Sequence, residues 1–232
     1  HLYNFLHSNK LLTDKQSGFR ANDSTINQLA YLYHTFSEAL DNKKEIRIVF
    51  CDISKAFDKV WHEGILYKLS KLGVRGNLLQ WFRNYLESRK QRVVIKGQSS
   101  NWGNIEAGVP QGSVLGPLLF LIYINDLVDN VTCGIRLFAD DTSLYLEFEN
   151  PDLAAHELNT NLNNIATWAD RWLVKFSPEK TKTMSISMKT NSHATDVPLV
   201  FNNVPLDEVD NHKHLGMIIN NKLKWTDHID YI

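Results

Sequence analysis

Two short apolar segments that meet at a pair of acids constrain the fold of this chain most. Residues 133–138 and 142–149 are separated only by Ala139, Asp140 and Asp141. Apolar runs of this length around a short turn predict a β-hairpin. Two adjacent carboxylates among apolar neighbours repel each other. The pair therefore indicates either a site where cations neutralise it or a solvated turn, and the sequence leaves both open.

The order of the other elements predicts the fold class. Helical spacing of apolar residues predicts helices over residues 23–40, 62–72, 77–88, 113–126 and 152–173. In the first of these, Asp23 is expected to be the cap and Ile26 to lie on the buried face. In the helix over residues 77–88, Leu78 and Trp81 are expected on one apolar face. Strands are expected over residues 45–53, 181–188, 199–201 and 213–219, and a second hairpin from 91–96 and 101–107 across a turn at 97–100. This order is neither a βαβ alternation nor a sandwich. It predicts an α+β protein with an antiparallel sheet and helices on one face. Residues 113–126 are apolar almost all round, which indicates a buried helix.

Composition narrows the class of protein. The chain has 232 residues, of which 43% are hydrophobic and 22% charged, as in ordinary globular proteins. Cys51 and Cys133 are too few for a disulfide framework and have no zinc-site spacing. The longest apolar run, residues 114–124, is shorter than the roughly 20 residues that a bilayer requires. We therefore expect no membrane segment.

The formal net charge of -1 hides two opposed regions. Read alone, it argues against a strongly basic nucleic-acid binder. Residues 68–96, however, hold eight basic residues against one acid, and residues 125–170 hold nine acids against one arginine. The basic region suits either a surface that follows phosphates or a solvated helix face.

A third acid has a setting similar to that of the Asp140–Asp141 pair. Asp52 ends the apolar segment that begins at Glu45. Strand-end acids that converge on one another could hold two Mg²⁺ ions roughly 3.5–4 Å apart and support phosphoryl transfer. A single strand-end Asp is otherwise a cap or turn residue. Since Asp52 and Asp140 are far apart in the chain, only the fold can bring them together.

Six motifs in this order resemble the reverse transcriptase domain of non-LTR (LINE-type, jockey-like) retrotransposons. They are Gln16–Arg20 with Ser24 and Thr25, Phe50–His62, Gly108–Phe120, Phe138–Asp141, Trp172–Lys182 and His214–Gly216. The long Gly108–Phe120 match is the most specific. Group II intron maturases and telomerase have related domains, but the second and third motifs are more similar to those of LINE-type elements.

The resemblance implies a right-hand polymerase fold. Residues 1–45 and 75–107 would be mainly fingers, and residues 46–74 and 108–232 mainly palm, ending at the primer-grip region with the thumb largely absent. It also implies an RNA template, a DNA primer and deoxynucleoside triphosphates as partners, and an endonuclease and a thumb in the parent polyprotein. The expected location is intracellular, and nuclear during target-primed insertion.

The resemblance also assigns residue roles. Asp52, Asp140 and Asp141 would be catalytic and would bind two Mg²⁺ ions, for which Mn²⁺ could substitute. The nucleotide would be bound by Arg20, Phe57, Gln111, Gly112 and Lys180, and the primer by the primer grip His214, Leu215 and Gly216.

Some of these roles have alternatives. Phe57 could exclude a 2′-hydroxyl or belong to the core, and Arg20 could form a surface salt bridge. Lys182 competes with Lys180 for the role near the pyrophosphate. His212 and His214 share a strand face, but no third metal ligand accompanies them.

Two other functions compete with a polymerase. The chain could be a truncated or domesticated copy that binds nucleic acid without polymerising, or a protein-interaction module that keeps only the fold.

Overall fold

The computed structural model of the chain describes residues 1–189 and 197–232. These form two compact units. The first unit contains residues 1–13, 55–126 and 171–174, and the second contains residues 14–54, 127–170 and 175–232. These bounds differ from the expected division into fingers and palm, and that division stays a prediction.

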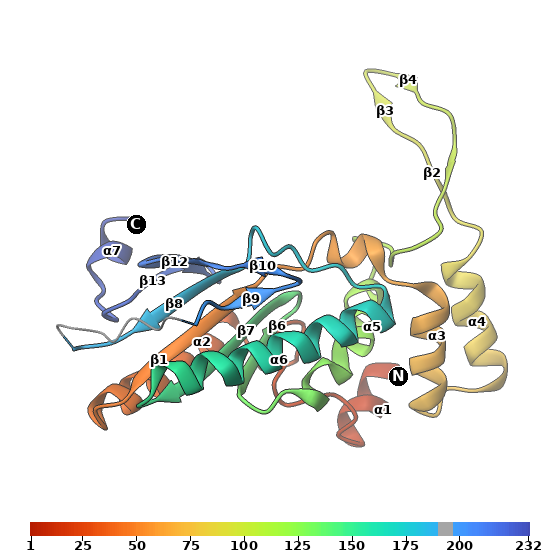
Figure 1. Ribbon diagram of the computed structural model, residues 1–232. Helices are drawn as coiled ribbons and strands as arrows, with labels where there is room; N and C mark the ends of the chain where they lie inside the picture. The colour runs from red at the N-terminus through yellow and green to blue at the C-terminus, as the bar shows by residue number, and fades with distance from the viewer. Residues whose placement is uncertain (190–196) are drawn as a thin grey trace. The chain divides into compact units, whose positions relative to one another are not determined.

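The first unit is built mainly from helices (Figure 1). Its elements are α1 (Leu2–Ser8), the 3₁₀ helix η1 (Ala56–Lys59), α3 (His62–Lys71), α4 (Gly76–Leu86), α5 (Leu115–Ile124) and the strands β2 (Lys90–Gln91), β3 (Val94–Ile95), β4 (Gln98–Ser99) and β5 (Gly103–Asn104). Helix α3 packs against both α4 and α5. Seven of the ten residues of α5 are buried, which confirms the expected buried helix. On α4, by contrast, Phe82 and Leu86 are buried but Leu78 and Trp81 are exposed, so the predicted apolar face was too wide.

A two-stranded ribbon follows α4 in the first unit. β2 pairs with β5, and β3 pairs with β4. The turn is formed by Lys96 and Gly97, whose φ angles are 49° and 82°. The expected turn at residues 97–100 was therefore wrong, because a two-residue hairpin turn with positive φ at both central positions places the bend earlier.

A five-stranded sheet forms the second unit (Figure 1). Its strands lie in the order β11 (Asp207–Glu208), β8 (Lys182–Ile186), β1 (Glu45–Cys51), β7 (Asp141–Phe148) and β6 (Gly134–Phe138). All pairs of neighbouring strands are antiparallel except the pair β11–β8, which is parallel. The sheet and the helices confirm the predicted α+β class.

Other elements complete the second unit. They are α2 (Thr25–Asp41), η2 (Asn125–Asn130), α6 (Pro151–Trp172), β9 (Val200–Phe201), β10 (Val204–Pro205), β12 (Asn211–His214), β13 (Met217–Asn220) and α7 (Thr226–Ile229). Of these, η2 and α6 each have two residues that belong to the first unit. No helix among the described residues has the length and apolar character needed to cross a membrane.

The core of the second unit surrounds β1. Leu32 and Phe36 of α2 belong to one cluster with Ile46 and Ile48, which point to the same face of β1. All seven residues of β1 are buried. Both faces of this strand are therefore covered, whereas the sequence pattern suggested helices on one face.

The start of α2 differs in detail from the prediction. Ser24, not Asp23, caps the helix, and its Oγ accepts a hydrogen bond from the backbone N–H of Asn27 at 3.2 Å. The carboxylate of Asp23 instead accepts from the N–H of Ser24 at 2.8 Å. Ile26 is 74% exposed, so it does not belong to the buried face, where Gln28 and Leu32 lie.

Candidate active site

The strand register brings Asp52 to the acidic turn. Cys51 pairs with Thr142 at the end of the β1–β7 ladder, and Asp52 is the next residue. Phe138 pairs with Asp141 across the β6–β7 hairpin. Ala139 and Asp140 therefore form its two-residue turn, and the antiparallel ladder leads Asp52 toward Asp141. The fold therefore brings Asp52 beside the acidic turn, where Asp52 and Asp141 line one cavity.

The electrostatics of this turn reflect three like charges. Partial burial, together with the charges of Asp140 and Asp52, raises the pKa of Asp141 to about 6. The pKa of Asp140 is raised as well, first by burial and then by the charge of Asp52. Repulsion among carboxylates is relieved either by a proton or by a cation.

The donor set fits a divalent cation. Carboxylate oxygens are the ligands that hard divalent cations prefer, and a cation would remove the repulsion that raises both pKa values. Within the described part of the chain, no group of three or more His, Cys, Asp or Glu side chains is already spaced to hold a metal ion. The carboxylates would therefore have to adjust their side-chain conformations to share one.

The backbone of Asp52 is held by a segment far along the chain. Ile53 forms an isolated antiparallel bridge with Phe176. The N–H of Ser177 donates to the carbonyl of Asp52, and the N–H of Ser54 donates to that of Lys175, each at 2.8 Å. This segment belongs to the motif Trp172–Lys182, so the motif positions a carboxylate as well as supplying a lysine.

Lys180 and Lys182 have different surroundings. Lys180 Nζ lies 3.8 Å from Asp52 Oδ2, and its side chain is 71% exposed. Lys182 Nζ instead donates to Asp207 Oδ2 at 2.6 Å and to the carbonyl of Glu179 at 2.9 Å. Of the two lysines, only Lys180 is placed beside the carboxylates.

Gln16 belongs to the first motif, but no role was predicted for its side chain from the sequence. Its Oε1 accepts hydrogen bonds from the N–H groups of Ala139 at 2.8 Å and Gly18 at 2.7 Å, and its Nε2 donates to the carbonyl of Ala139 at 3.2 Å. Gln16 is buried, and Ala139 has a left-handed φ of 54°. The buried amide therefore holds the strained turn that carries Asp140.

The segment around Gln16 also contacts strand β6. The N–H of Ser17 donates to the carbonyl of Leu137, and the N–H of Leu137 donates to that of Lys15, each at 2.9 Å. A Cβ on Gly18 would lie 2.1 Å from the backbone nitrogen of Ala139, so only glycine fits there. The predicted nucleotide ligand Arg20 follows this segment directly and is half-buried.

The predicted primer grip is a hairpin. β12 pairs with β13, and Leu215 and Gly216 form its turn with φ angles of 49° and 88°. The single strand expected over residues 213–219 was wrong, since positive φ at two successive residues reverses the chain there. The ring of His214 packs on Phe50 with centroids 5.2 Å apart, and the ring of His212 stacks on Phe50 at 4.0 Å.

A cavity of about 190 Å³ joins the primer-grip hairpin to the carboxylates. Five residues predicted for the site line it: Asp52, Asp141, Lys180, His214 and Leu215. Burial lowers the pKa of His214 to about 4 and also lowers that of His212. Both rings are neutral at physiological pH, which agrees with structural or primer-side roles.

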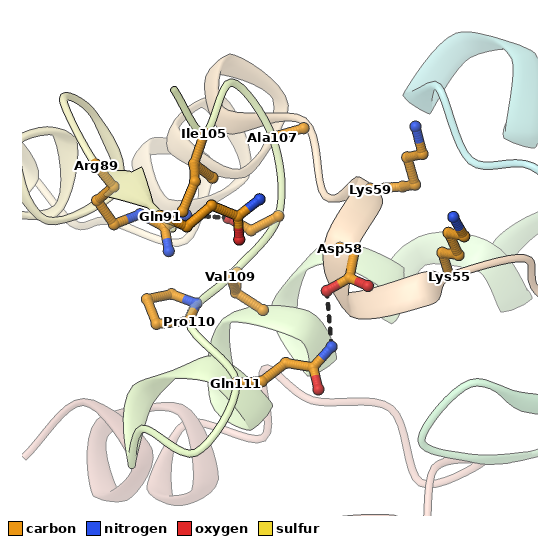
Figure 2. Close-up of a pocket in the computed structure, with 11 residues that line it drawn as sticks. Lys55, Asp58, Lys59, Arg89, Gln91, Ile105, Ala107, Val109, Pro110 and Gln111 are labelled. Atoms are coloured by element: carbon orange, nitrogen blue, oxygen red, sulfur yellow. Dashed lines mark hydrogen bonds between the residues drawn. The ribbon is translucent and has the colours of Figure 1, made fainter. Parts of the chain in front are cut away.

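The remaining predicted residues lie in the first unit. Figure 2 shows a pocket of about 530 Å³ in which Gln111 Nε2 donates to Asp58 Oδ1 at 2.7 Å. Gly112, with a φ of 77°, follows in an open loop. Phe57 is half-buried and stacks on Phe120 with centroids 4.3 Å apart. The lining of the pocket includes three cationic side chains, Lys55, Lys59 and Arg89.

Comparison with known proteins decides the family. The family model described as reverse transcriptase (RNA-dependent DNA polymerase) matches residues 1–220. The chain belongs to the reverse transcriptase family. The expected resemblance to non-LTR elements is confirmed by the curated relatives of this reverse transcriptase.

Two relatives come from Drosophila melanogaster. The probable RNA-directed DNA polymerase from transposon BS is 34% identical over 95% of the chain and 25% of its own length. The RNA-directed DNA polymerase from mobile element jockey is 33% identical over 97% of the chain and 26% of its own length. The reverse transcriptase chain thus spans about a quarter of these relatives.

Solved structures confirm the fold. Apo telomerase from Candida tropicalis, truncated from its C-terminal domain, matches with a TM-score of 0.64 at 14% identity, over 95% of this chain and 42% of that one. Candida tropicalis telomerase in complex with the TWJ fragment of telomeric RNA matches with a TM-score of 0.65 at 15% identity, over 96% of this chain and 36% of that one. This likeness shows the right-hand polymerase fold of the reverse transcriptase chain.

Proposed function

We propose that the chain is the polymerase core of a non-LTR retrotransposon and adds deoxynucleotides to a primer 3′-hydroxyl on an RNA template. The observation that carries the proposal is the register of β1 and β7, which leads Asp52 toward Asp140 and Asp141. Burial and mutual repulsion, which together raise the pKa of Asp141, suit a site that is completed by cations.

The proposed cofactor is Mg²⁺, held by the carboxylates of Asp52, Asp140 and Asp141. When bound, Mg²⁺ ions supply activation of the attacking hydroxyl and neutralisation of the charge that develops on the phosphates. The chain itself holds the carboxylates in place through the bridge at Phe176 and through the Gln16 amide. Lys180, beside Asp52, is placed to donate a proton or a hydrogen bond to a phosphate oxygen.

Selection of the nucleotide is assigned to the first unit and to Arg20. Phe57 would exclude the 2′-hydroxyl sterically, and Phe120 fixes the plane of its ring. Gln111 and Gly112 would contact the nucleotide, with Asp58 orienting the Gln111 amide. Arg20 would pair with a phosphate of the nucleotide. The primer would lie against His214, Leu215 and Gly216.

The parent protein is proposed to be a longer polyprotein with a thumb and an endonuclease, acting in the nucleus during target-primed insertion. The curated relatives support a longer parent, because the chain spans only about a quarter of each.

Primer extension on an RNA template tests the proposal. We expect the wild-type chain to extend a DNA primer with Mg²⁺, and Asp52→Asn and Asp140→Asn each to abolish extension. Asp170→Asn removes an exposed acid on α6 and serves as the matched control, with normal extension expected. In the same assay, Phe57→Val should lower discrimination against ribonucleotides by about 10- to 100-fold.

The rival function makes the opposite prediction. A domesticated copy would bind the template–primer but not extend it, and that result for the wild type would sink the polymerase assignment. Unchanged ribonucleotide discrimination in Phe57→Val would place Phe57 in the core instead.

A further inference from the structure

The ribbon formed by residues 90–104 has no core of its own. Every residue in this range is exposed, including the apolar side chains of Val93, Val94, Ile95 and Trp102. Figure 1 shows the ribbon extending away from α3 and α4 of the same unit. An isolated two-stranded ribbon is at best marginally stable in water. Its exposed apolar side chains are thus available to a partner.

The ribbon also holds the uncompensated charge of the basic region. Lys90, Arg92 and Lys96 lie in it, and residues 90–104 contain no acid. In the part of the chain that the structure describes, none of these three side chains has an acidic partner. An anionic partner would therefore meet cations that no internal ion pair occupies.

Three other basic residues of the same region are occupied. Lys68 is buried and its Nζ lies 2.5 Å from Asp126 Oδ1. Arg83 pairs with both Glu63 and Glu87. Arg89 donates to the carbonyl of Gly108 at 2.6 Å. Lys68, Arg83 and Arg89 are thus structural cations, whereas the three cations of the ribbon are available to a partner.

An aromatic platform accompanies the cations. The guanidinium of Arg92 lies 4.7 Å from the ring centroid of Trp102, whose side chain is 60% exposed. Exposed aromatic rings interleaved with basic side chains suit unpaired bases, because a base can stack while its phosphates contact the cations. An acidic polypeptide would use the charges but not the platform.

The base of the ribbon extends this surface. Arg89 and Gln91 line the pocket shown in Figure 2, together with Lys55 and Lys59. Asp58 also lines this pocket, but the three cations Lys55, Lys59 and Arg89 outnumber it, so an excess of positive charge continues from the ribbon into a pocket of the same unit. An extended anionic strand could follow both.

We propose that the ribbon is a binding surface for single-stranded nucleic acid. Lys90, Arg92 and Lys96 contact phosphates, and Trp102 stacks on a base. A single strand is favoured over a duplex, since stacking on a side chain requires a base that is not stacked within a helix. The inference goes beyond the proposed function, because it concerns binding without catalysis.

The salt dependence of binding tests the proposal. Fluorescent oligo(U) and oligo(dT) are titrated with the 232-residue chain by anisotropy, without nucleotides or divalent metal, from about 50 to about 200 mM salt. The variant Lys90→Gln, Arg92→Gln, Lys96→Gln should reduce the slope of log K against log salt by about 2, since each lost phosphate contact on a single strand removes roughly 0.7. Trp102→Ala should weaken binding about tenfold and leave the slope unchanged.

A charge-matched control makes the result specific. Lys10→Gln, Lys43→Gln, Arg171→Gln removes the same charge from exposed positions outside the ribbon and should retain the wild-type slope. All variants should melt like the wild type, because none of the substituted side chains is buried.

Three results would overturn the proposal. They are a wild-type chain that does not bind the oligonucleotides, a ribbon variant with the wild-type slope, and a control variant that loses as much as the ribbon variant. Poly-glutamate is titrated in the same way as a second probe. If the ribbon variant loses poly-glutamate binding but retains oligonucleotide binding, the ribbon would be assigned to an acidic protein instead. Primer extension is measured separately, so inactive polymerase with intact ribbon binding would remove the proposed function and keep this one.

Discussion

At the scale of single residues, the acidic turn depends on a conformation that its own side chains do not favour. Ala139 adopts a φ of 54°. For a residue with a Cβ, this left-handed conformation costs about 1–2 kcal/mol. Three hydrogen bonds around the buried Gln16 amide offset that cost. We infer that Gln16 is a positioning residue, which would act on the proposed metal site through the backbone of Ala139.

Gln16→Ala should therefore impair both stability and metal use. It leaves the N–H groups of Ala139 and Gly18 without their acceptor, so we expect a loss of about 2–4 kcal/mol in the free energy of unfolding. We also expect primer extension to need more Mg²⁺ for half-maximal rate. Denaturant unfolding and an Mg²⁺ titration of the rate measure the two quantities.

Gln28 offers a matched control for this prediction. It is buried in the same unit, but neither polar atom of its side chain has a hydrogen-bond partner among the residues that the structure describes. Gln28→Leu should therefore be neutral or stabilising and leave the Mg²⁺ requirement unchanged. If Gln16→Ala lowers stability without changing that requirement, the amide only supports the fold.

The sequence could predict the acids but not what holds them. Asp140 and Asp141 stand out because they are adjacent between two apolar segments. Gln16 gives no comparable signal, since it is 123 residues from Ala139 and its bonds are to backbone atoms. Only a motif match drew attention to it.

At the scale of elements, apolar periodicity predicted the main helices and strands but not the tight turns. The ribbon and the primer-grip hairpin both bend at two residues of positive φ, Lys96–Gly97 and Leu215–Gly216. The usual sequence signal for such turns is Asn-Gly or Asp-Gly, and neither turn has it. The hairpin at Asp140 was found because polar residues interrupt its apolar strands.

The loop that carries Gln111 makes a prediction at this scale. Gly108 has a φ of 88°, and a Cβ there would lie 2.7 Å from the carbonyl oxygen of Asp58. The N–H of Gly108 donates to the carbonyl of Val60 at 2.8 Å, which holds the loop against η1. Gly108→Ala should therefore displace the loop and destabilise the protein by about 2–3 kcal/mol in a urea titration.

Gly112→Ala separates crowding from backbone strain. Gly112 also has a positive φ, but a Cβ there would meet no atom of the described residues within 4 Å. We expect only the conformational cost of about 1–2 kcal/mol. If Gly108→Ala and Gly112→Ala lose the same free energy of unfolding, the contact with Asp58 does not hold the loop.

At the scale of the whole molecule, net charge was the least informative quantity, because it is the sum of opposed regions. The acidic region contains Asp140 and Asp141, and the basic region includes both the paired cations Lys68 and Arg83 and the cations of the ribbon. Motif order predicted the family and the fold. The two units could not be predicted from order, since each is assembled from separate segments of chain.

The three carboxylates tie the stability of the molecule to pH and metal. The pKa of Asp141 is about 6 in the folded protein, above its ordinary value near 4. The protonated form therefore favours folding. The contribution of the protonated Asp141 side chain to the free energy of unfolding is complete below about pH 4 and is lost as the pH rises through about 6. Above that pH, the ionised group destabilises the metal-free protein by about 1 kcal/mol after solvent screening.

A divalent cation should reverse this effect, because it favours the ionised carboxylates. At ten times its Kd, Mg²⁺ would stabilise the protein by about 1.4 kcal/mol, which corresponds to a Tm increase of about 3–6 °C near pH 7. The increase should be smaller near pH 5, where protons compete for Asp141. Without metal, Asp141→Asn should melt above the wild type near pH 7 and with it near pH 4. The variant Asp140→Asn removes a carboxylate from the site. If Mg²⁺ raises the Tm of this variant as much as that of the wild type, the ion binds elsewhere.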